Sequence, residues 1–333
     1  MPVEQNQQQQ SSAAMAGSNA IAIETVGLRH NFGDVAAVKN FSATIYRGEI
    51  FGIVGPDSAG KSTVIRILCG LLKPSGGSAT ILGYNLLKEP QKVKERIGYL
   101  SQEFTLYGDL TIDENIEFFA RLHNVKNFEQ RRDYLLKFTR LEPFRDRLAQ
   151  NLSGGMKKKL ALACTLIHTP QIIFLDEPST GVDPVSRGEF WNILSEILRQ
   201  GVTIVMTTPY LDEAERCHRV GLMHRGELVI ADTSERIKAS MPGKVYDIIC
   251  RNPQAAYRLL INQFSPSRLL LYGDRVRLWV KNEAQLQDAL NSIRANADSG
   301  CGFEIGEPTL EDAFVAFTSE QDSVSNLNER ANL

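Results

Sequence analysis

The sequence predicts an α/β protein whose main domain is built on a mostly parallel sheet. Three short apolar runs have the length and composition of buried strands, namely Glu49–Gly55, Ile172–Glu177 and Val202–Thr208. Segments with helical periodicity, such as Ser62–Leu72 and Pro184–Gln200, alternate with them. Because parallel strands need long crossover connections, which are usually helices, this alternation favours a parallel α/β core.

The segments around this core are predicted in chain order. Residues 21–26 and 41–46 alternate apolar and polar side chains on either side of a turn at 32–35, which is typical of paired strands. Thr111 is a favourable N-cap, with Glu114 three residues later, and it opens a helical stretch that runs to about Gln150.

A second, smaller domain is predicted after Met241–Gly243, where the pattern changes. We place an α+β domain at residues 244–318, after a main domain at 21–242 and before a polar tail at 319–333. Residues 1–20 are polar, contain a run of glutamines and are expected to be a disordered tail. The predicted elements of the small domain are strands at 245–250, 268–273 and 275–280, and helices at 255–264, 283–293 and 309–318.

The composition narrows the classes of function. Of 333 residues, 43% are hydrophobic and 23% charged, which is ordinary for a globular protein. The formal net charge of −2 argues against a nucleic-acid partner, because no basic excess neutralises phosphates. No segment approaches the roughly 18 consecutive apolar residues of a membrane span. Five scattered cysteines predict reduced thiols rather than disulfides.

Gly55–Ser62 fits the pattern GxxxxGK[ST], between a buried strand and a helix. The backbone N–H groups of such a loop surround a phosphate, and the helix start adds the positive end of its dipole. Lys61 is expected to neutralise the β- and γ-phosphates of ATP, and Ser62 to bind Mg²⁺. A glycine-rich turn without function is the alternative, and the flanking strand and helix argue against it. The residues expected to contact the nucleotide here are Gly55, Pro56, Asp57, Ser58, Ala59, Gly60, Lys61, Ser62 and Thr63.

The strand Ile172–Glu177 ends in two acids. Asp176 is expected to hold Mg²⁺, and Glu177 to polarise the attacking water as a general base. Taken alone, such a strand end is more often simply solvated. The phosphate loop upstream favours the catalytic interpretation.

Leu152–Met156 (LSGGM) precedes a predicted helix at 157–166, so its amides would form a second anion-binding helix start. In isolation, a simple helix cap would explain Ser-Gly-Gly as well. The segment resembles LSGGQ, the signature of ABC transporter ATP-binding proteins, and we call it the signature segment. In that family, the γ-phosphate of ATP bound to a second cassette is contacted by the residues that match Ser153, Gly154 and Gly155 here.

The resemblance covers roughly residues 21–240. It implies a P-loop NTPase ABC cassette with an antiparallel β subdomain and a helical subdomain at about 104–160. Residues 307–318 (EPTLEDAFVAFT) resemble the tail of drug-resistance-type ATPases, which belong to type-2 ABC exporters. The nearest likeness is to the YbhF-like efflux ATPases.

The resemblance also implies roles for single residues. Gln102 resembles the glutamine that contacts Mg²⁺ and relays to the membrane subunit, and Asp183 resembles the aspartate of the D-loop. Phe32 matches the aromatic residue that stacks on adenine, with a buried core phenylalanine as the alternative. Residues 104–115 would be the docking surface for a membrane subunit, where Tyr107 and Leu110 either make the contact or fill the core.

Two departures from the family pattern concern hydrolysis. Pro209 stands where the family has a histidine that hydrogen-bonds the γ-phosphate, and proline has no side-chain donor. Thr208 as N-cap and Pro209 at the first helical position would still start a helix. Asp57 and Ser58 replace Asn and Gly in the phosphate loop. We expect ATP binding to survive these changes, while turnover at this site is slow.

The resemblance implies an ATP-binding subunit of a bacterial ABC exporter at the cytoplasmic face of the inner membrane. Its expected ligands are ATP and Mg²⁺. Its expected partners are membrane-spanning subunits, a second ATPase cassette and a periplasmic adaptor protein. The second cassette is either identical to this chain or, as Pro209 favours, non-identical. A regulatory ATP-binding subunit with little hydrolysis and a non-transport ABC ATPase are the alternatives.

Overall fold

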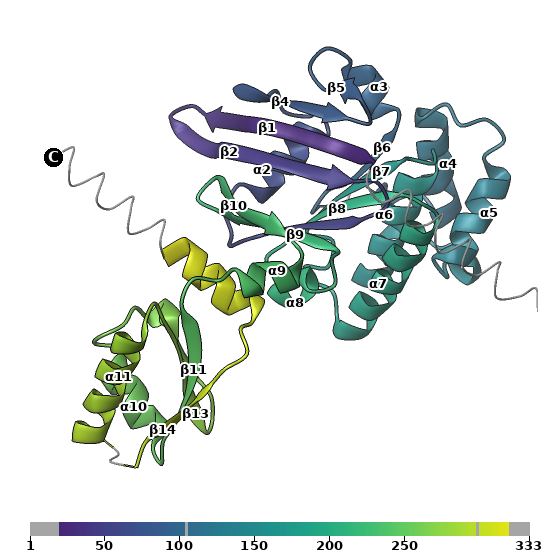
Figure 1. Ribbon diagram of the computed structural model, residues 1–333. Coiled ribbons are helices and arrows are strands. Elements are labelled where there is room, and N and C mark those ends of the chain that lie inside the picture. The colour runs from purple at the N-terminus through teal and green to yellow at the C-terminus, as the bar shows by residue number, and fades with distance from the viewer. Residues whose placement is uncertain (1–19, 104–105, 298–299, 320–333) are drawn as a thin grey trace, which may run out of the picture. The chain divides into compact units, whose positions relative to one another are not determined.

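The computed structural model describes residues 20–103, 106–297 and 300–319, shown in colour in Figure 1. The chain divides into two compact units, Met1–Ala231 and Asp232–Leu333. This boundary lies about ten residues before the predicted one, and the division into domains at 21–242 and 244–318 stays a prediction. The expected tails, 1–20 and 319–333, lie outside the described residues except for Ala20 and Ser319.

The first unit contains a sheet of ten strands in the order β5-β4-β1-β2-β10-β9-β3-β8-β7-β6 within the described residues. Its helices lie beside this sheet in Figure 1. The strands are β1 (Ile21–Phe32), β2 (Val35–Tyr46), β3 (Ile50–Val54), β4 (Gly76–Ile81), β5 (Tyr84–Asn85), β6 (Ile97–Leu100), β7 (Ile172–Asp176), β8 (Thr203–Thr208), β9 (Arg219–His224) and β10 (Glu227–Asp232).

The centre of the sheet is parallel, as the sequence predicts. β3 lies between β8 and β9, and β7 lies between β8 and β6, with all four pairs parallel. Every residue of β3, β7 and β8 is buried, which explains why apolar side chains dominate these strands. Because Val54 pairs with Thr208, and Asp176 with Thr207, the carboxyl ends of β3, β7 and β8 meet at one edge.

The opposite side of the sheet is antiparallel. β1 pairs with β2 and β4, and β4 pairs with β5, all antiparallel. The α/β fold class and the antiparallel strands beside a parallel core are therefore confirmed. The helices of the first unit are α2 (Lys61–Leu68), α3 (Pro90–Lys94), α4 (Ile112–Leu122), α5 (Glu129–Phe138), α6 (Gly154–Leu166), α7 (Pro184–Arg199) and α8 (Leu211–Ala214).

Helix α4 begins with the predicted capping box. The Thr111 hydroxyl accepts a hydrogen bond from the Glu114 amide, and the Glu114 carboxylate accepts one from the Thr111 amide. Such a box satisfies N–H groups that the first helical turn leaves unpaired. Helix α4 packs on α6, the helix that follows the signature segment.

The second unit contains a four-stranded sheet in the order β12-β13-β11-β14 within the described residues. One hydrophobic cluster joins Ile248 and Leu278 of the sheet to Leu260 and Leu290 of the helices. The Arg277 guanidinium lies 2.8 Å from the Asp312 carboxylate of the last helix. The elements are α9 (Ser234–Ala239), β11 (Lys244–Ile249), α10 (Pro253–Leu260), β12 (Leu269–Leu271), β13 (Arg275–Val280), α11 (Glu283–Asn296), β14 (Gly302–Ile305) and a helix at 310–319.

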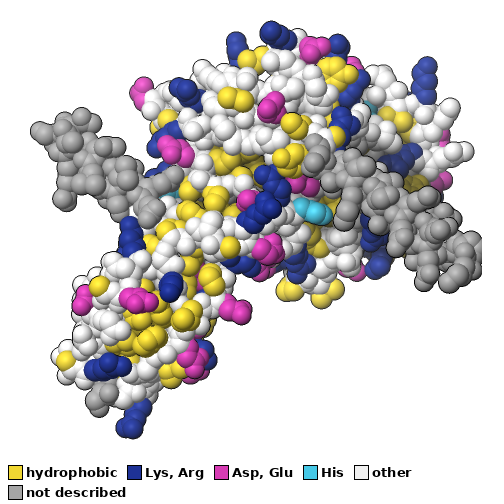
Figure 2. All heavy atoms as spheres, viewed as in Figure 1, with side chains coloured by type: hydrophobic (Ala, Val, Ile, Leu, Met, Phe, Trp, Pro, Cys, Tyr) yellow, Lys and Arg dark blue, Asp and Glu magenta, His cyan; other side chains and the backbone are white. Residues whose placement is uncertain are grey.

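The surface and the helix lengths add two observations. On the face drawn in Figure 2, acidic and basic side chains are interspersed rather than gathered by sign. None of the helices in the described part of the chain combines the length and the apolar character that a membrane span requires.

Candidate nucleotide-binding site

A cavity of 600 Å³ lies at the edge of the sheet where β3, β7 and β8 end. The loops that follow these three strands supply most of its wall, because parallel strands bring their carboxyl ends together. The cavity is lined by Asp57, Ser58, Gly60, Lys61, Ser62, Thr63, Gln102, Glu177, Thr180, Pro209 and Tyr210.

Glycines hold the phosphate loop against the neighbouring backbone. A Cβ at Gly55 would lie 2.1 Å from the Met223 carbonyl oxygen, and a Cβ at Gly60 would lie 2.4 Å from that of Ala37. Ser58, which replaces a glycine of the family pattern, has a φ of 64°. That left-handed conformation costs a side-chain-bearing residue about 1–2 kcal/mol. The loop is therefore tightly packed at both glycines and strained at Ser58.

Lys61 is the first residue of α2 and is 4% exposed. Its ammonium donates to the carbonyl oxygens of Gly55 and Pro56, at 2.9 and 3.0 Å. It also lies 3.6 Å from Oε1 of Glu177. These contacts hold a buried positive charge at the cavity wall, where a triphosphate would meet it.

Asp176 joins three elements through its carboxylate. Its Oδ1 accepts hydrogen bonds from the hydroxyls of Ser62, at 2.8 Å, and Thr207, at 2.7 Å. Its Oδ2 is buried and has no hydrogen-bond partner among the described residues. A buried carboxylate oxygen without a partner, beside a serine hydroxyl, fits the oxygen ligands that Mg²⁺ requires.

Glu177 follows Asp176 with a φ of 48°, a conformation that non-glycine residues rarely adopt. Its Oε2 accepts a hydrogen bond from Nε2 of Gln102 at 3.0 Å and one from the Thr180 hydroxyl at 3.4 Å. The Thr207 hydroxyl accepts a hydrogen bond from the Glu177 amide. The carboxylate is thus held at the cavity wall from two sides.

Pro209 and Tyr210 line the cavity after β8, but they do not start the helix as we expected. Helix α8 begins at Leu211, and Tyr210 occupies its N-cap position without a side-chain cap. The Thr208 hydroxyl instead donates to Oε2 of Glu213, at 2.8 Å, and accepts from the Tyr210 amide. The predicted start was therefore two residues early: the Thr208 hydroxyl accepts a hydrogen bond from the Tyr210 amide in the turn before the helix.

The other expected contacts lie away from this cavity. Phe32, at the end of β1, is 50% exposed, so it is not a core residue, and it does not line the cavity. Ser153 is the N-cap of α6, where its hydroxyl accepts a hydrogen bond from the Met156 amide. Gly154 is exposed, while a Cβ at Gly155 would lie 2.7 Å from the Ser186 hydroxyl. The signature segment therefore does not line this cavity.

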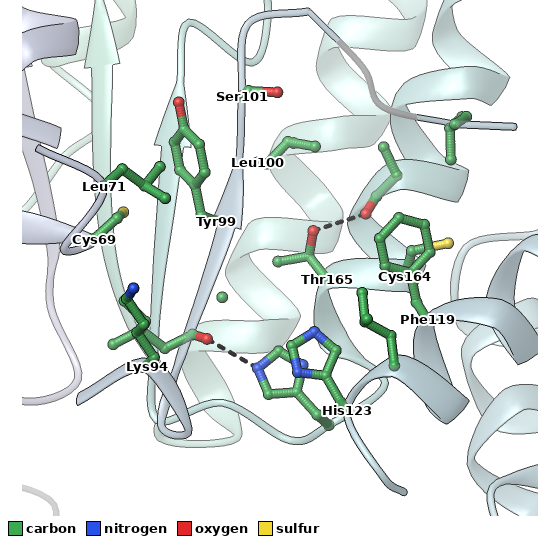
Figure 3. Close-up of a pocket in the computed structure, with 16 residues that line it drawn as sticks. Cys69, Leu71, Lys94, Tyr99, Leu100, Ser101, Phe119, His123, Cys164 and Thr165 are labelled. Atoms are coloured by element: carbon green, nitrogen blue, oxygen red, sulfur yellow. Dashed lines mark hydrogen bonds between the residues drawn. The ribbon is translucent and has the colours of Figure 1, made fainter. Parts of the chain in front are cut away.

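A second cavity, of 440 Å³, lies between β6 and helices α4 and α6. Figure 3 shows Tyr99 and Leu71 on one side of it, with Phe119 and His123 on the other. Its wall is mainly apolar and carries no phosphate-binding motif. Of the expected docking surface nearby, Tyr107 is 42% exposed and Leu110 half-buried, while residues 104–105 lie outside the described residues.

Sequence reasoning missed three groups at the first cavity. Thr207 and Thr180 contact the two acids, and Tyr210 contributes to the wall. Thr207 stands near the end of an apolar strand, as Asp176 does. That shared position at a strand end was the signal that could have placed Thr207 in the site. Nothing in the local sequence distinguishes Thr180 or Tyr210 from ordinary loop residues.

A strand, a glycine loop and a helix that carries Lys-Ser, facing an Asp-Glu strand end, define a P-loop nucleoside-triphosphate-binding protein. A family model described as ABC transporter matches residues 38–180. The chain is 41% identical over 307 residues to the probable multidrug ABC transporter ATP-binding protein YbhF of Escherichia coli K12, covering 89% of this chain and 52% of that protein. It thus spans about half the length of the first of these curated relatives.

Other relatives match over nearly their whole length. The daunorubicin/doxorubicin resistance ATP-binding protein DrrA of Streptomyces peucetius is 32% identical, covering 89% of this chain and 92% of DrrA. The Nod factor export ATP-binding protein I of Rhizobium sp. N33 is 32% identical, covering 90% and 98%. The chain therefore belongs to the family of ABC transporter ATP-binding proteins.

Solved structures agree with this assignment. CbiO1 from Clostridium perfringens, part of the ABC transporter complex cbiONQ, superposes with a TM-score of 0.61 at 29% identity, over 67% of this chain and 92% of that one. The cassette MJ0796, solved as a dimer bound to ADP and Pi, gives 0.58 at 26% identity, over 63% and 98%. The ABC cassette fold predicted from the sequence is confirmed.

Proposed function

We propose that this chain is the ATP-binding subunit of an ABC exporter. ATP closes a pair of cassettes and its hydrolysis opens them, which drives efflux of a drug, a lipid or a similar substrate through separate membrane-spanning subunits. The observation that carries the proposal is one cavity in which Lys61, Ser62 and Glu177 meet. The likeness to drug-resistance and export ATP-binding proteins supports the direction of transport.

Each part of the site has a proposed role. Lys61 neutralises the β- and γ-phosphates, and the loop amides of 55–63 surround them. Mg²⁺ would be held by Ser62, Gln102 and Asp176, and it would neutralise charge on the phosphates. Glu177 is the proposed general base that orients the attacking water. Phe32 stacks on adenine.

We further propose that the partner cassette is a different chain. Pro209 lines the cavity where a γ-phosphate donor would stand, and it has no side-chain N–H or O–H. This site then holds ATP and hydrolyses it slowly. The intact Ser153–Gly155 segment contacts ATP that is bound to a histidine-bearing partner. Both cassettes lie at the cytoplasmic face of a bacterial inner membrane. A periplasmic adaptor protein completes the exporter.

Turnover of the chain alone and mixed with the histidine-bearing cassette tests the pairing. We expect slow hydrolysis by the chain alone and faster hydrolysis by the mixture. Ser153→Arg in this chain should abolish the faster rate, because it blocks the signature segment. Glu177→Gln should leave most of it, because the active base belongs to the partner. Robust hydrolysis by the chain alone, abolished by Glu177→Gln, would contradict the pairing.

Transport is tested in inverted membrane vesicles that contain the membrane-spanning subunits and the partner cassette. We expect ATP-dependent uptake of a fluorescent drug or lipid only when this chain is added, and no uptake with Lys61→Met. Lys39→Met, on an exposed strand position, is the matched control. A regulatory subunit would instead change the rate without being required. ATP binding that no membrane subunit influences would point to a non-transport ATPase.

A further inference from the structure

A cluster of buried charges lies behind the nucleotide cavity and has no role in the site described so far. Lys158 is 6% exposed and Glu213 is 1% exposed, and the Arg187 side chain is largely covered. They come from α6, α8 and α7, respectively. Burying charged side chains is costly unless they are paired, so their contacts are expected to constrain these elements tightly.

Glu213 connects the segments that follow β7 and β8. Its Oε2 accepts hydrogen bonds from the hydroxyls of Ser179, at 2.7 Å, and Thr208, at 2.8 Å. Nε of Arg187 lies 3.7 Å from its other oxygen. One carboxylate therefore links the loop that begins at Glu177 to the segment that carries Pro209.

Lys158 connects the same loop to the helix of the signature segment. Its ammonium donates to the Thr180 carbonyl oxygen at 2.5 Å. The Thr180 amide donates to the Glu177 carbonyl oxygen at 3.3 Å, and the Thr180 hydroxyl donates to the Glu177 carboxylate at 3.4 Å. Since Ser153 caps the helix on which Lys158 stands, a continuous path of contacts leads from the signature segment to Glu177.

The charges around Lys158 suit this position. The pKa of Lys158 is lowered to about 8, chiefly by burial; the Glu213 carboxylate opposes this, the Arg187 guanidinium adds to it, and the Glu177 carboxylate opposes it. Near neutral pH the side chain is an ammonium, which is a stronger donor to a backbone carbonyl than a neutral amine.

We propose that Lys158 is a positioning residue that ties the helix of the signature segment to Thr180 and thereby orients Glu177. Helix α6 moves as a rigid element, so a nucleotide contact at its Ser153 end is transmitted to Thr180. ATP bound to the partner would then influence the geometry of this chain's own general base. The proposal rests on the proposed function for the roles of Glu177 and of the signature segment.

Hydrogen exchange of the full chain, read by mass spectrometry, tests the tie without any hydrolysis. Lys158→Met removes the ammonium and keeps an unbranched stem of similar length. We expect amides in 178–183 to exchange at least tenfold faster than in the unchanged chain. Lys159→Met is the matched control, since Lys159 stands next on α6 and pairs with Glu189 of α7 instead. Unchanged exchange in Lys158→Met would overturn the proposal.

Single-turnover hydrolysis of radiolabelled ATP tests the effect on Glu177. We expect Lys158→Met to lower the rate constant at least tenfold with the Kd for ATP within twofold, and Lys158→Arg to restore most of the loss. A raised Kd with an unchanged rate constant would show a purely structural lysine. Thr180→Val is the second variant in case Lys158→Met folds poorly, because it breaks the same path of contacts at the Glu177 carboxylate. An unchanged rate constant in Thr180→Val would also overturn the proposal. If the chain hydrolyses no ATP at all, the proposed function is contradicted. The hydrogen-exchange experiment then decides whether Lys158 ties α6 to Thr180.

Discussion

The Ser62 hydroxyl donates a 2.8 Å hydrogen bond to Oδ1 of Asp176, across 114 positions of sequence. This contact joins the first turn of α2 to the end of β7. It also places a hydroxyl oxygen and a carboxylate at one point of the cavity wall, with Oδ2 of Asp176 buried and without a hydrogen-bond partner among the described residues. The protein itself therefore holds in position two oxygens of the kind that hard cations bind.

Asp176→Asn is expected to remove the dependence of ATP binding on Mg²⁺. The amide keeps the size of the side chain but loses the charge that a divalent cation needs. The gain in ATP affinity that Mg²⁺ brings should fall on the order of 10- to 100-fold, as measured by calorimetry with Mg²⁺ and with EDTA. Asp146→Asn, at an exposed position, should keep the full effect. An equal Mg²⁺ effect in both variants would place the metal elsewhere.

Pro209→His is expected to raise hydrolysis by the chain alone. The substitution supplies an imidazole at a position that lines the cavity with Lys61 and Glu177. We expect a rise of about 10- to 100-fold in steady-state phosphate release, up to the lower end of what a positioned acid–base group contributes. Combining it with Glu177→Gln should cancel the gain. A rate unchanged by Pro209→His would mean that another feature, such as the strain at Ser58, limits turnover.

Two glycine substitutions should change stability in opposite directions. Gly55→Ala places a Cβ 2.1 Å from the Met223 carbonyl oxygen and should lower the free energy of unfolding by about 1–3 kcal/mol or more. Gly188→Ala, in the interior of α7 with nothing within 4 Å, should raise it by about 0.5–1 kcal/mol. Urea denaturation followed by circular dichroism measures both. A stable Gly55→Ala would show that the loop relaxes away from β9.

Two stacked histidines predict a loss of stability in mild acid. The rings of His123 and His168 lie 4.0 Å apart, 8° from parallel. Burial lowers the pKa of both, and each protonated ring would disfavour the other. The pKa values of the two histidines in the folded chain lie below the unfolded value of about 6.5. Their contribution to the free energy of unfolding is therefore fully present above that pH. It falls as the pH drops from 6.5 toward the folded values, since the unfolded chain binds protons first.

His123→Phe is the matched variant for this effect. It keeps an aromatic ring against His168 and removes one titrating group. Urea midpoints measured between pH 8 and pH 5 should decline less steeply for His123→Phe than for the unchanged chain. Parallel curves for the two proteins would assign the acid sensitivity to other groups, such as the carboxylates that are ion-paired in the first unit.

The local features of the site could be predicted from the sequence because their causes are local. The glycines of 55–62 and the capping box of Thr111 and Glu114 act within a few residues, through backbone conformation and unpaired N–H groups. Apolar side chains dominate the buried strands β3, β7 and β8 because these strands are central and both of their faces are covered. The ABC signature then identified the family.

The contacts among these features could not be predicted in the same way. Gln102 reaches Glu177, and Thr207 reaches Asp176, only because the strand order places β6 and β8 on either side of β7. The predicted start of α8 was two residues early. Thr208 has the side chain of an N-cap, but its hydroxyl accepts a hydrogen bond from the Tyr210 amide and donates to the carboxylate of Glu213, five residues later.

The sequence by itself therefore determined that this chain has a phosphate loop, a strand-end pair of acids and a signature segment, since each is a short pattern with its own chemistry. The tertiary structure alone decided which of them share a cavity, and it joined Lys158 to Thr180 behind it. Strand order and helix packing depend on burying apolar surface over the whole unit. A local sequence pattern does not encode the total apolar surface that the unit buries. Contacts between distant segments therefore appear only in the folded chain.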